Sequence, residues 1–254
     1  MQETLLRIKE VSKHFGGVWA VSGVSLTIKS GSIWGLIGPN GSGKTTLFNT
    51  VAGLHRPDAG DIYFNGTRIN NLNPHQIYTL GLVNTFQIPR LFPRLSVLDN
   101  MLVAARGHQG DKFFNNLFLR KSWQAQEGEL AEKAMEILEL LELDHLASSP
   151  AGELSGGQRK LLEIGRGVMA SPTLLLLDEP AAGVNPKLAR RIFERIEDLR
   201  EKKGLSYFII EHRLELLFDF ASWVYVMDKG RVVVEGRPAE VAENPTFYQV
   251  YLGE

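Results

Sequence analysis

The 254-residue chain contains no cysteine. Disulfides and thiolate metal sites are therefore excluded, and the absence fits a reducing compartment. The net charge of -1 at pH 7 gives no overall electrostatic reason to expect a nucleic-acid partner. No apolar run approaches the ~18 residues of a membrane-spanning helix, and the opening MQETLLRIKE lacks the basic-then-apolar layout of a signal peptide. We expect a protein that neither spans a membrane nor is exported, although attachment to a membrane through a partner stays open.

The composition, 44% apolar and 22% charged, is typical of a soluble globular protein with a large core. Strands and helices alternate along the chain, which indicates an α/β fold with a mostly parallel sheet and right-handed crossovers. The pattern predicts strands within 5–15, 18–31, 32–40, 61–66, 173–180, 206–212, 223–228 and 231–236. It predicts helices from about 44 to 54, from 157 to 170 and from Pro186, and a short helix between the strands 206–212 and 223–228.

The middle of the chain has a helical pattern. Ser96 and Asp99 form a capping-box-like helix start. Five apolar residues of a later segment fall on one helical face, namely Leu130, Ala134, Ile137, Leu138 and Leu141. We therefore expect a single domain in which residues 91–170 form a helical lobe, inserted into a core made of residues 1–90 and 171–254.

The stretch GPNGSGKTT matches the P-loop pattern in full, and it lies between a predicted strand and a predicted helix, the context that supports the match. In such a loop glycines let the backbone wrap around the phosphates of a nucleotide, a lysine adds positive charge and a hydroxyl binds Mg²⁺. The predicted nucleotide-binding residues are Gly38, Pro39, Asn40, Gly41, Ser42, Gly43, Lys44, Thr45 and Thr46. Lys44 is also a predicted catalytic residue, and Thr45 a predicted metal ligand. The alternative is an accidental glycine-rich turn.

Two adjacent carboxylates, Asp178 and Glu179, follow the apolar run 174–177. An isolated pair of this kind is ordinarily solvated surface. Here the run predicts a strand buried on both faces, so the pair is expected at the carboxyl edge of the sheet, where ligands of such folds bind. We predict that Asp178 binds Mg²⁺ and that Glu179 polarises the attacking water. His212 ends the next strand and is predicted to act at the same edge, although a lone histidine is more often structural.

A second glycine-rich turn, LSGGQ at residues 154–158, opens another helix. Unpaired N–H groups and the helix dipole favour an anion there, and a plain helix cap is the alternative. One such cradle is enough for one nucleotide. The second one therefore needs a separate explanation.

GPNGSGKTT, Gln87, LSGGQ, LLLLDEP and His212, in this order, resemble the ATP-binding cassette of ABC transporters over essentially the entire chain. The resemblance implies a P-loop NTPase core with an N-terminal antiparallel β subdomain and an inserted helical lobe. It also implies that two subunits pack head to tail and that the LSGGQ turn of each closes over the ATP held by the other. The residues expected to act on the partner's nucleotide are Ser155, Gly156, Gly157 and Gln158.

The same resemblance assigns two further residues. Gln87 is expected to contact the metal and to take part in catalysis, and Phe15 to stack on adenine at a position where tyrosine is common. A core aromatic in an edge strand is the alternative for Phe15. The chain departs from the family pattern at Asn185, since most cassettes have an aspartate there, in a loop that bridges the two nucleotide sites.

Several stretches resemble the ATP-binding subunits of branched-chain amino acid importers, namely residues 43–66 and 81–105, the insert 111–123, AGVNP, IIEHRLELL and the ending VYLGE. Related systems import amides or urea, and the residues do not separate these. The resemblance implies ATP and Mg²⁺ as cofactors, a second ABC ATP-binding subunit (the same chain or a paralogue), transmembrane permease subunits and, indirectly, an external solute-binding protein. It further implies a peripheral position on the cytoplasmic face of the inner membrane, and no nucleic-acid partner.

Two apolar segments are candidates for contact with a permease. Residues 87–95 lie at the join of core and lobe, where the family binds a short permease helix. The run from Phe113 to Trp123 is a second candidate, although we favour the interior of the lobe for it.

Other functions stay open as alternatives. The main one is a cytosolic assembly ATPase that needs no permease. ABC proteins of DNA repair or chromosome structure carry long coiled coils or extra domains, and translation-associated cassettes usually have two P-loops, so both are disfavoured. A regulatory cassette without turnover is disfavoured because Lys44, Asp178, Glu179 and His212 are all present.

Overall fold

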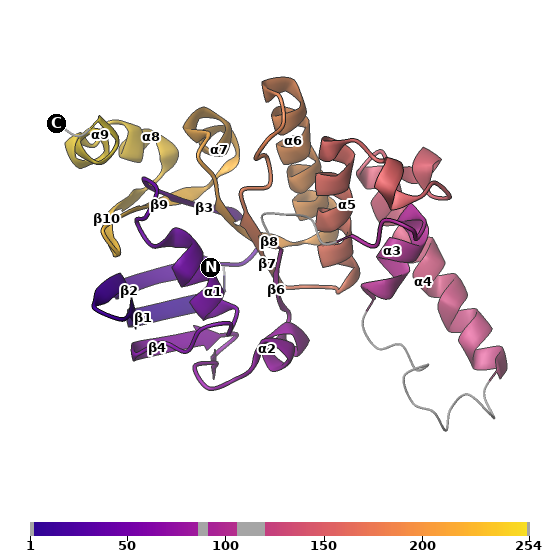
Figure 1. Ribbon diagram of the computed structural model, residues 1–254, viewed down its shortest axis with the longest axis horizontal. Helices are drawn as coiled ribbons and strands as arrows, with labels where there is room; N and C mark the ends of the chain where they lie inside the picture. Colours follow the sequence, from indigo (N-terminus) through magenta and orange to yellow (C-terminus); the bar gives the residue numbers. More distant parts are fainter. Residues whose placement is uncertain (1–2, 86–90, 106–119, 253–254) are drawn as a thin grey trace.

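The computed structural model describes residues 3–85, 91–105 and 120–252, the side chains of 120–127 and 252 excepted (Figure 1). Six strands form the larger sheet in the order β10-β9-β3-β8-β7-β6. Their bounds are Ile33–Ile37 for β3, Leu82–Asn84 for β6, Leu174–Asp178 for β7, Ser206–Ile210 for β8, Trp223–Asp228 for β9 and Arg231–Gly236 for β10. Every neighbouring pair is parallel except β9 and β10. The prediction of an α/β fold with a mostly parallel sheet is confirmed.

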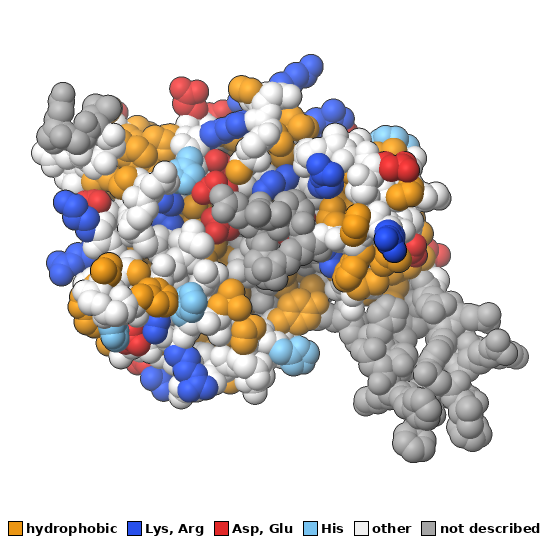
Figure 2. Space-filling model, viewed as in Figure 1, with side chains coloured by type: hydrophobic (Ala, Val, Ile, Leu, Met, Phe, Trp, Pro, Cys, Tyr) orange, Lys and Arg blue, Asp and Glu red, His pale blue; other side chains and the backbone are white. Residues whose placement is uncertain are grey.

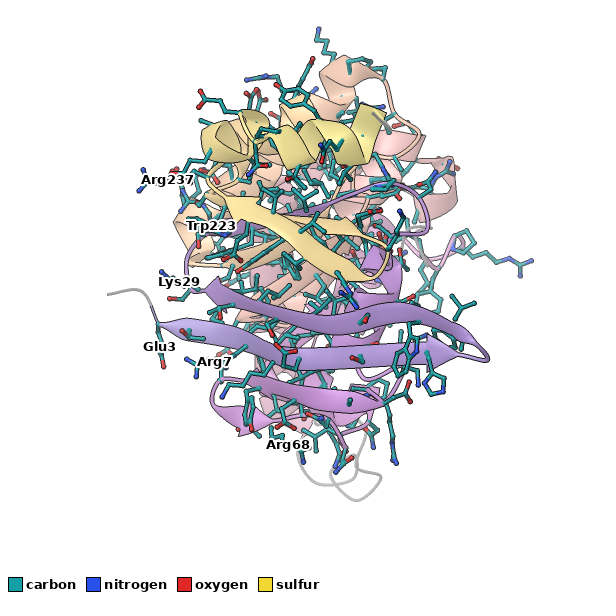
Figure 3. All side chains as sticks on the ribbon, turned by 90° about the vertical axis from the view of Figure 1, so that its left-hand side faces the viewer. Glu3, Arg7, Lys29, Arg68, Trp223 and Arg237 are labelled. Carbon is teal, nitrogen blue, oxygen red and sulfur yellow. The ribbon has the colours of Figure 1, made fainter. Side chains whose placement is uncertain are left out.

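The second sheet is antiparallel, with strand order β2-β1-β4-β5. Its strands are β1 Thr4–Phe15, β2 Val18–Lys29, β4 Ala59–Phe64 and β5 Thr67–Arg68. In Figure 3, β2, β1 and β4 lie below β9 and β10, so the two sheets form separate layers. Helix α1, Lys44–Val51, contributes Leu47, Phe48 and Val51 to a core that it shares with both sheets. It ends within three residues of the predicted boundary, where Gly53 takes a left-handed backbone conformation with φ of 77°.

The strands of the larger sheet are buried on both faces, which explains their continuous apolar sequences. In β3, Ile33 and Ile37 join the core that faces the helices, whereas Trp34 and Leu36 join the core that faces α1 and the second sheet. The helices on the first side are α5 Gly156–Met169, α6 Pro186–Lys203 and α7 Leu214–Phe220 (Figure 1). Because β3, β8 and β7 are parallel neighbours, their carboxyl ends lie at one edge of the sheet.

Helices α3, Val97–Val103, and α4, Arg120–Leu140, pack with α5 on the side of the molecule away from the antiparallel sheet (Figure 1). The predicted capping box is present, because the Ser96 hydroxyl accepts the Asp99 N–H at 2.9 Å and the Asp99 carboxylate accepts the Ser96 N–H. The predicted apolar face is buried at Ala134, Ile137, Leu138 and Leu141 and partly buried at Leu130.

Three helices were not predicted, namely α2 Pro74–Leu80, α8 Pro238–Ala242 and α9 Pro245–Leu252. Each is short, so it shows little helical periodicity in the sequence. Each begins with a proline, and a proline at the first helical position is the available signal for such a start. Within the described ranges, none of the helices combines the length and the apolar character needed to cross a bilayer.

Candidate functional site

The phosphate loop connects β3 to α1, and its glycines are needed because the backbone passes close to neighbouring segments. Gly38 has φ of 148°, and a Cβ there would lie 2.1 Å from the Met227 carbonyl oxygen. A Cβ at Gly43, with φ of 101°, would lie 2.1 Å from the Ala20 carbonyl oxygen. Gly41, in contrast, is exposed and open. One side of the loop therefore packs closely against the backbone of neighbouring segments, while its other side is accessible.

Lys44 begins helix α1, and its side chain folds back over the loop. The ammonium donates hydrogen bonds to the carbonyl oxygens of Gly38 and Pro39, both at 2.9 Å. Gly43, which precedes the helix, provides no side-chain cap, so the N–H groups of the first turn are available to an anion. Burial lowers the pKa of the Lys44 ammonium, although Glu179 and Asp178 act in the opposite direction. The cradle is thus positively charged and faces two carboxylates.

Asp178 ends β7 and is almost completely buried, with 9% of the residue exposed. Burial raises the pKa of its carboxyl group, and the neighbouring Glu179 raises it further, whereas a hydrogen bond from Thr45 lowers it. The Oδ1 atom is buried without a hydrogen-bond partner among the described residues. An unpartnered buried carboxylate oxygen beside a hydroxyl fits the oxygen ligands that Mg²⁺ prefers. The pair Thr45 and Asp178 is therefore suited to hold a divalent cation next to the phosphate loop.

Glu179 and His212 are brought together as predicted. Glu179 has an uncommon left-handed backbone conformation, with φ of 52°, and its N–H donates to the Ile210 carbonyl at 2.9 Å. Its Oε1 lies 2.9 Å from Nε2 of His212. The end of β7 is thereby tied to the end of β8, and a carboxylate and an imidazole meet at the sheet edge that carries Asp178.

The second glycine-rich turn forms the start of α5. Ser155 caps the helix in a capping box with Gln158, whose side chain accepts the Ser155 N–H at 2.9 Å. Ser155 and Gly156 are exposed, and a Cβ on Gly156 would meet nothing within 4 Å. A Cβ on Gly157 would instead lie 2.2 Å from Leu188 of α6. Among the described residues, no hydrogen bond joins this turn to residues 38–46 of the same chain. The turn is a plain helix cap within the monomer, and its open side faces outward.

Phe15 ends β1 with 48% of its surface exposed. Its ring contacts the His55 ring edge-on, with 5.2 Å between the ring centres, and the Lys13 ammonium lies 5.5 Å from the centre of the Phe15 ring. Asp58 fixes this strand end by accepting the His14 N–H at 2.7 Å and the Lys13 ammonium at 3.0 Å. The sequence did not reveal His55 or Asp58 as neighbours of Phe15, because the contact depends on how the two strands meet.

Some predicted residues lie outside the description. These are Gln87 and residues 88–90 of the first candidate permease segment, and most of the run from Phe113 to Trp123. Of the remaining first segment, Phe92 and Leu95 are exposed to 46% and 37%.

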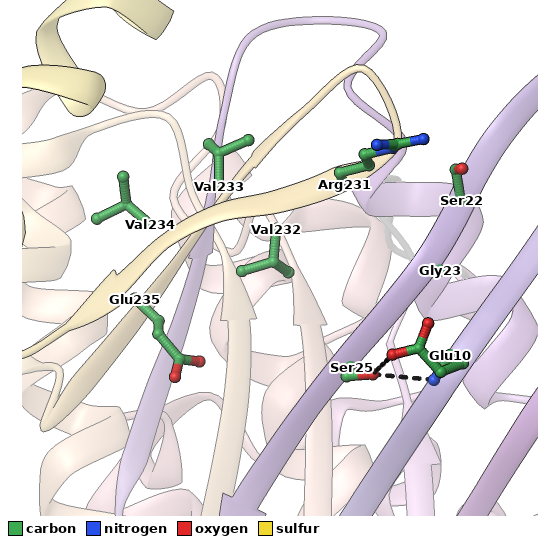
Figure 4. Close-up of a pocket in the computed structure, with 9 residues that line it drawn as sticks. All are labelled: Glu10, Ser22, Gly23, Ser25, Arg231, Val232, Val233, Val234 and Glu235. Carbon is green, nitrogen blue, oxygen red and sulfur yellow. Dashed lines mark hydrogen bonds between the residues drawn. The ribbon is translucent and has the colours of Figure 1, made fainter.

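A separate hollow of about 540 Å³ lies between β2 and β10 (Figure 4). It is lined by Glu10, Ser22, Gly23, Ser25 and residues 231–235, and Ser25 donates to Glu10 there at 2.9 Å. None of the predicted site residues lines it. Lys and Arg side chains are interspersed with Asp and Glu over the face shown in Figure 2, in keeping with the small net charge. Neither feature points to a site other than the phosphate loop and its sheet edge.

Comparison with known proteins also indicates an ATP-binding cassette. A family model described as ABC transporter matches residues 21–182. A probable branched-chain amino acid transport ATP-binding protein, LivG of Archaeoglobus fulgidus, is 45% identical over 249 residues, which is 98% of this chain and 95% of the relative.

Solved structures are similar over nearly the whole chain. One is an ATP-binding cassette of an ABC transporter in its ADP conformation, with a TM-score of 0.85 and 41% identity over 99% of this chain and 100% of the other. Another is a dimeric ATP-binding cassette in a post-hydrolysis state with ADP and phosphate. It has a TM-score of 0.74 and 25% identity, covering 92% of this chain and 99% of the other.

Proposed function

Since the chain belongs to the ABC transporter family, we propose that it is the ATP-hydrolysing subunit of an importer of branched-chain amino acids or closely related solutes. The observation that carries the hydrolytic part is the meeting of Glu179 and His212, 2.9 Å apart, beside Asp178 and the phosphate loop. The names of relatives similar over the whole chain support the solute class. A binding module that only held nucleotide would not need this pair.

Nucleotide binding is assigned to the phosphate loop. The N–H groups of residues 41–46 and the Lys44 ammonium contact the phosphates, and Phe15 stacks on the base. The carbonyl oxygens that now accept the Lys44 ammonium are exchanged for phosphate oxygens when ATP enters. Lys44 therefore reaches the nucleotide by moving its side chain while the helix stays in place.

A magnesium ion fits the site through Thr45 and Asp178, and when bound it neutralises charge on the transferred phosphoryl group. Among the described residues no three His, Asp or Glu side chains form a metal site by themselves. Phosphate oxygens and water would complete its ligands. Gln87 is proposed to contact this metal and the γ-phosphate, as in the family that the chain resembles.

Hydrolysis is assigned to Glu179 with His212. The Glu179 carboxylate orients and polarises the water that attacks the γ-phosphorus in line. His212 lies 2.9 Å from Oε1 of Glu179 and is assigned to position this base and to stabilise charge on the γ-phosphate. Both side chains come from strand ends of a buried sheet, which keeps their geometry fixed before the nucleotide binds.

A second ATP-binding subunit completes the site. Ser155 and Gly156 are exposed in the monomer, and helix α5 directs its positive end outward from them. We assign this turn to the γ-phosphate bound by the partner, which is the same chain or a paralogue. The dimer acts on permease subunits served by an external solute-binding protein, at the cytoplasmic face of the inner membrane. Within each subunit, the core of 1–90 and 171–254 holds the phosphate loop, and the lobe of 91–170 carries the turn that acts on the partner's nucleotide.

The substitution Glu179→Gln tests this proposal. The amide cannot accept a proton, so we expect ATP hydrolysis to fall by about 10²–10³ while ATP binding is retained. The protein should then accumulate as an ATP-dependent dimer in size-exclusion chromatography. Glu201→Gln, a change at an exposed glutamate, is the control and should behave like wild type. A Glu179→Gln protein that hydrolyses ATP at the wild-type rate and stays monomeric with ATP would contradict the proposal.

A further inference from the structure

The backbone that carries His212 is fixed by a carboxylate that the mechanism does not use. Glu211 follows β8 and is buried, with 2% of the residue exposed. Its Oε1 accepts the N–H of His212 at 2.9 Å and the N–H of Arg213 at 3.2 Å. Its Oε2 is buried and has no hydrogen-bond partner among the described residues. Burying a carboxylate this deeply costs free energy unless the group is hydrogen-bonded. Here the two backbone N–H groups supply those hydrogen bonds, and the contacts define the turn after the strand.

The next side chain reaches a different loop. Arg213 donates a hydrogen bond from Nη2 to the carbonyl oxygen of Val184. Val184 belongs to residues 181–185, which connect Glu179 to helix α6. Arg213 is thus attached at its backbone to Glu211 and at its guanidinium to the loop that follows Glu179. Because the planar guanidinium is rigid and always charged, this contact fixes distance and direction.

The loop makes few other hydrogen bonds, although Ala181 is buried in the core and Val184 packs against it. The Ala182 N–H donates to the Glu179 carbonyl at 3.0 Å, and Asn185 caps α6 by accepting the Leu188 N–H at 2.9 Å. Both contacts are local. In the part of the chain that the structure describes, the hydrogen bond from Arg213 is the one that joins residues 181–184 to another element.

We propose that Glu211 and Arg213 are positioning residues, which hold His212 and the loop 181–185 in a fixed relation on the two sides of Glu179. The side chain of Glu179 is held by His212, and the chain that leaves Glu179 is held by Arg213. We call the contacts made by Glu211 and Arg213 the link. Its role rests on the proposed function, because the link matters for ATP hydrolysis only if Glu179 and His212 carry out that reaction. Neither residue contacts the nucleotide. The link sets the geometry of the hydrolytic step and leaves the affinity for ATP unchanged.

Steady-state hydrolysis by the full chain tests the effect on catalysis. Arg213→Ala is expected to lower kcat by about tenfold, because small misplacements of reacting groups are costly, with KM for ATP within about twofold of wild type. Arg213→Lys, which keeps a donor, should recover part of kcat. Glu211→Gln keeps the Oε1 acceptor and should stay near wild type, whereas Glu211→Ala should lose activity. The matched control is Arg190→Ala, an exposed arginine of α6 that lines, together with Arg213, a second hollow between α6 and α7.

Hydrogen–deuterium exchange of the nucleotide-free protein tests the link without activity. Peptides covering residues 181–188 should exchange about fivefold faster in Arg213→Ala than in wild type, because local opening controls exchange. In Arg190→Ala their exchange rate should equal that of wild type. If the alanine variant does not fold, Arg213→Met, which keeps most of the apolar stem, replaces it.

The proposal is overturned if Arg213→Ala has wild-type kcat and wild-type exchange. It is also overturned if Glu211→Gln loses as much activity as Glu211→Ala, since the acceptor would then be irrelevant. A wild-type chain without ATP hydrolysis would remove the proposed function alone, and the exchange comparison would still decide whether the link exists.

Discussion

At the residue scale, Asp58 shows how one carboxylate fixes the strand end that carries Phe15, the residue proposed to stack on the base. It accepts hydrogen bonds from the backbone N–H of His14, the His14 ring and the Lys13 ammonium. These three contacts fix the end of β1, where Phe15 presents its ring. The backbone hydrogen bond from His14 is the largest reason why the pKa of Asp58 falls from 3.8 to about 2. The position of Phe15 is therefore expected to depend on the ionisation of Asp58.

The lowered pKa predicts the direction of a pH effect. Because the folded state prefers the carboxylate, Asp58 contributes stability that is fully present above pH 3.8 and is lost as the pH falls through about 2. Urea unfolding of wild type and Asp58→Asn, compared across pH, checks this. The difference between their midpoints should be constant above about pH 5, shrink below pH 4 and disappear only below about pH 2, where the carboxyl group is protonated in both states. A difference that grows on acidification would contradict the assignment.

At the element scale, the start of α5 is fixed against α6 through the missing side chain of Gly157. A Cβ there would lie 2.2 Å from Cδ2 and 2.9 Å from Cγ of Leu188. We expect Gly157→Ala to lower the free energy of unfolding by about 1–3 kcal/mol through overpacking. Gly156→Ala meets open space and should be nearly neutral, which makes it the matched control in denaturant titration. Adding Leu188→Ala should relieve the clash, and failure to do so would show that another contact is responsible.

The elements that the sequence predicted are those with a strong one-dimensional pattern. Strands β7 and β8 are recognisable because burial on both faces gives them nearly continuous apolar sequences, and α6 because Pro186 begins it and an apolar stripe follows. Helices α2, α8 and α9 are too short for periodicity to appear, and only their capping residues mark them. The link from Arg213 to Val184 has no pattern at all, since it joins two loops that the sheet brings together.

At the scale of the whole molecule, the sequence placed Asp178, Glu179 and His212 together because parallel strands end at one edge of a sheet. The contacts of Phe15 were beyond prediction, since they depend on how β1 and β4 pair and where α1 ends. The second glycine-rich turn was explained by resemblance rather than by geometry. In the structure, Ser155 and Gly156 are exposed, so they are accessible to a second chain.

A complementation experiment decides whether the site is shared between two chains. Lys44→Ala removes the phosphate-binding charge, and Gly156→Asp adds a negative charge where the monomer has open space, so each variant alone should be inactive. If the turn of one chain acts on the nucleotide of the other, a mixed dimer contains one intact site, made from the phosphate loop of the Gly156→Asp chain and the turn of the Lys44→Ala chain. Random mixing would then restore about a quarter of wild-type hydrolysis, half of the dimers with one of two sites. If each chain used its own turn, both sites of the mixed dimer would carry a defect and no activity would return. Pull-down through a tag on one variant must show that mixed dimers form, and their formation without hydrolysis would refute the shared site.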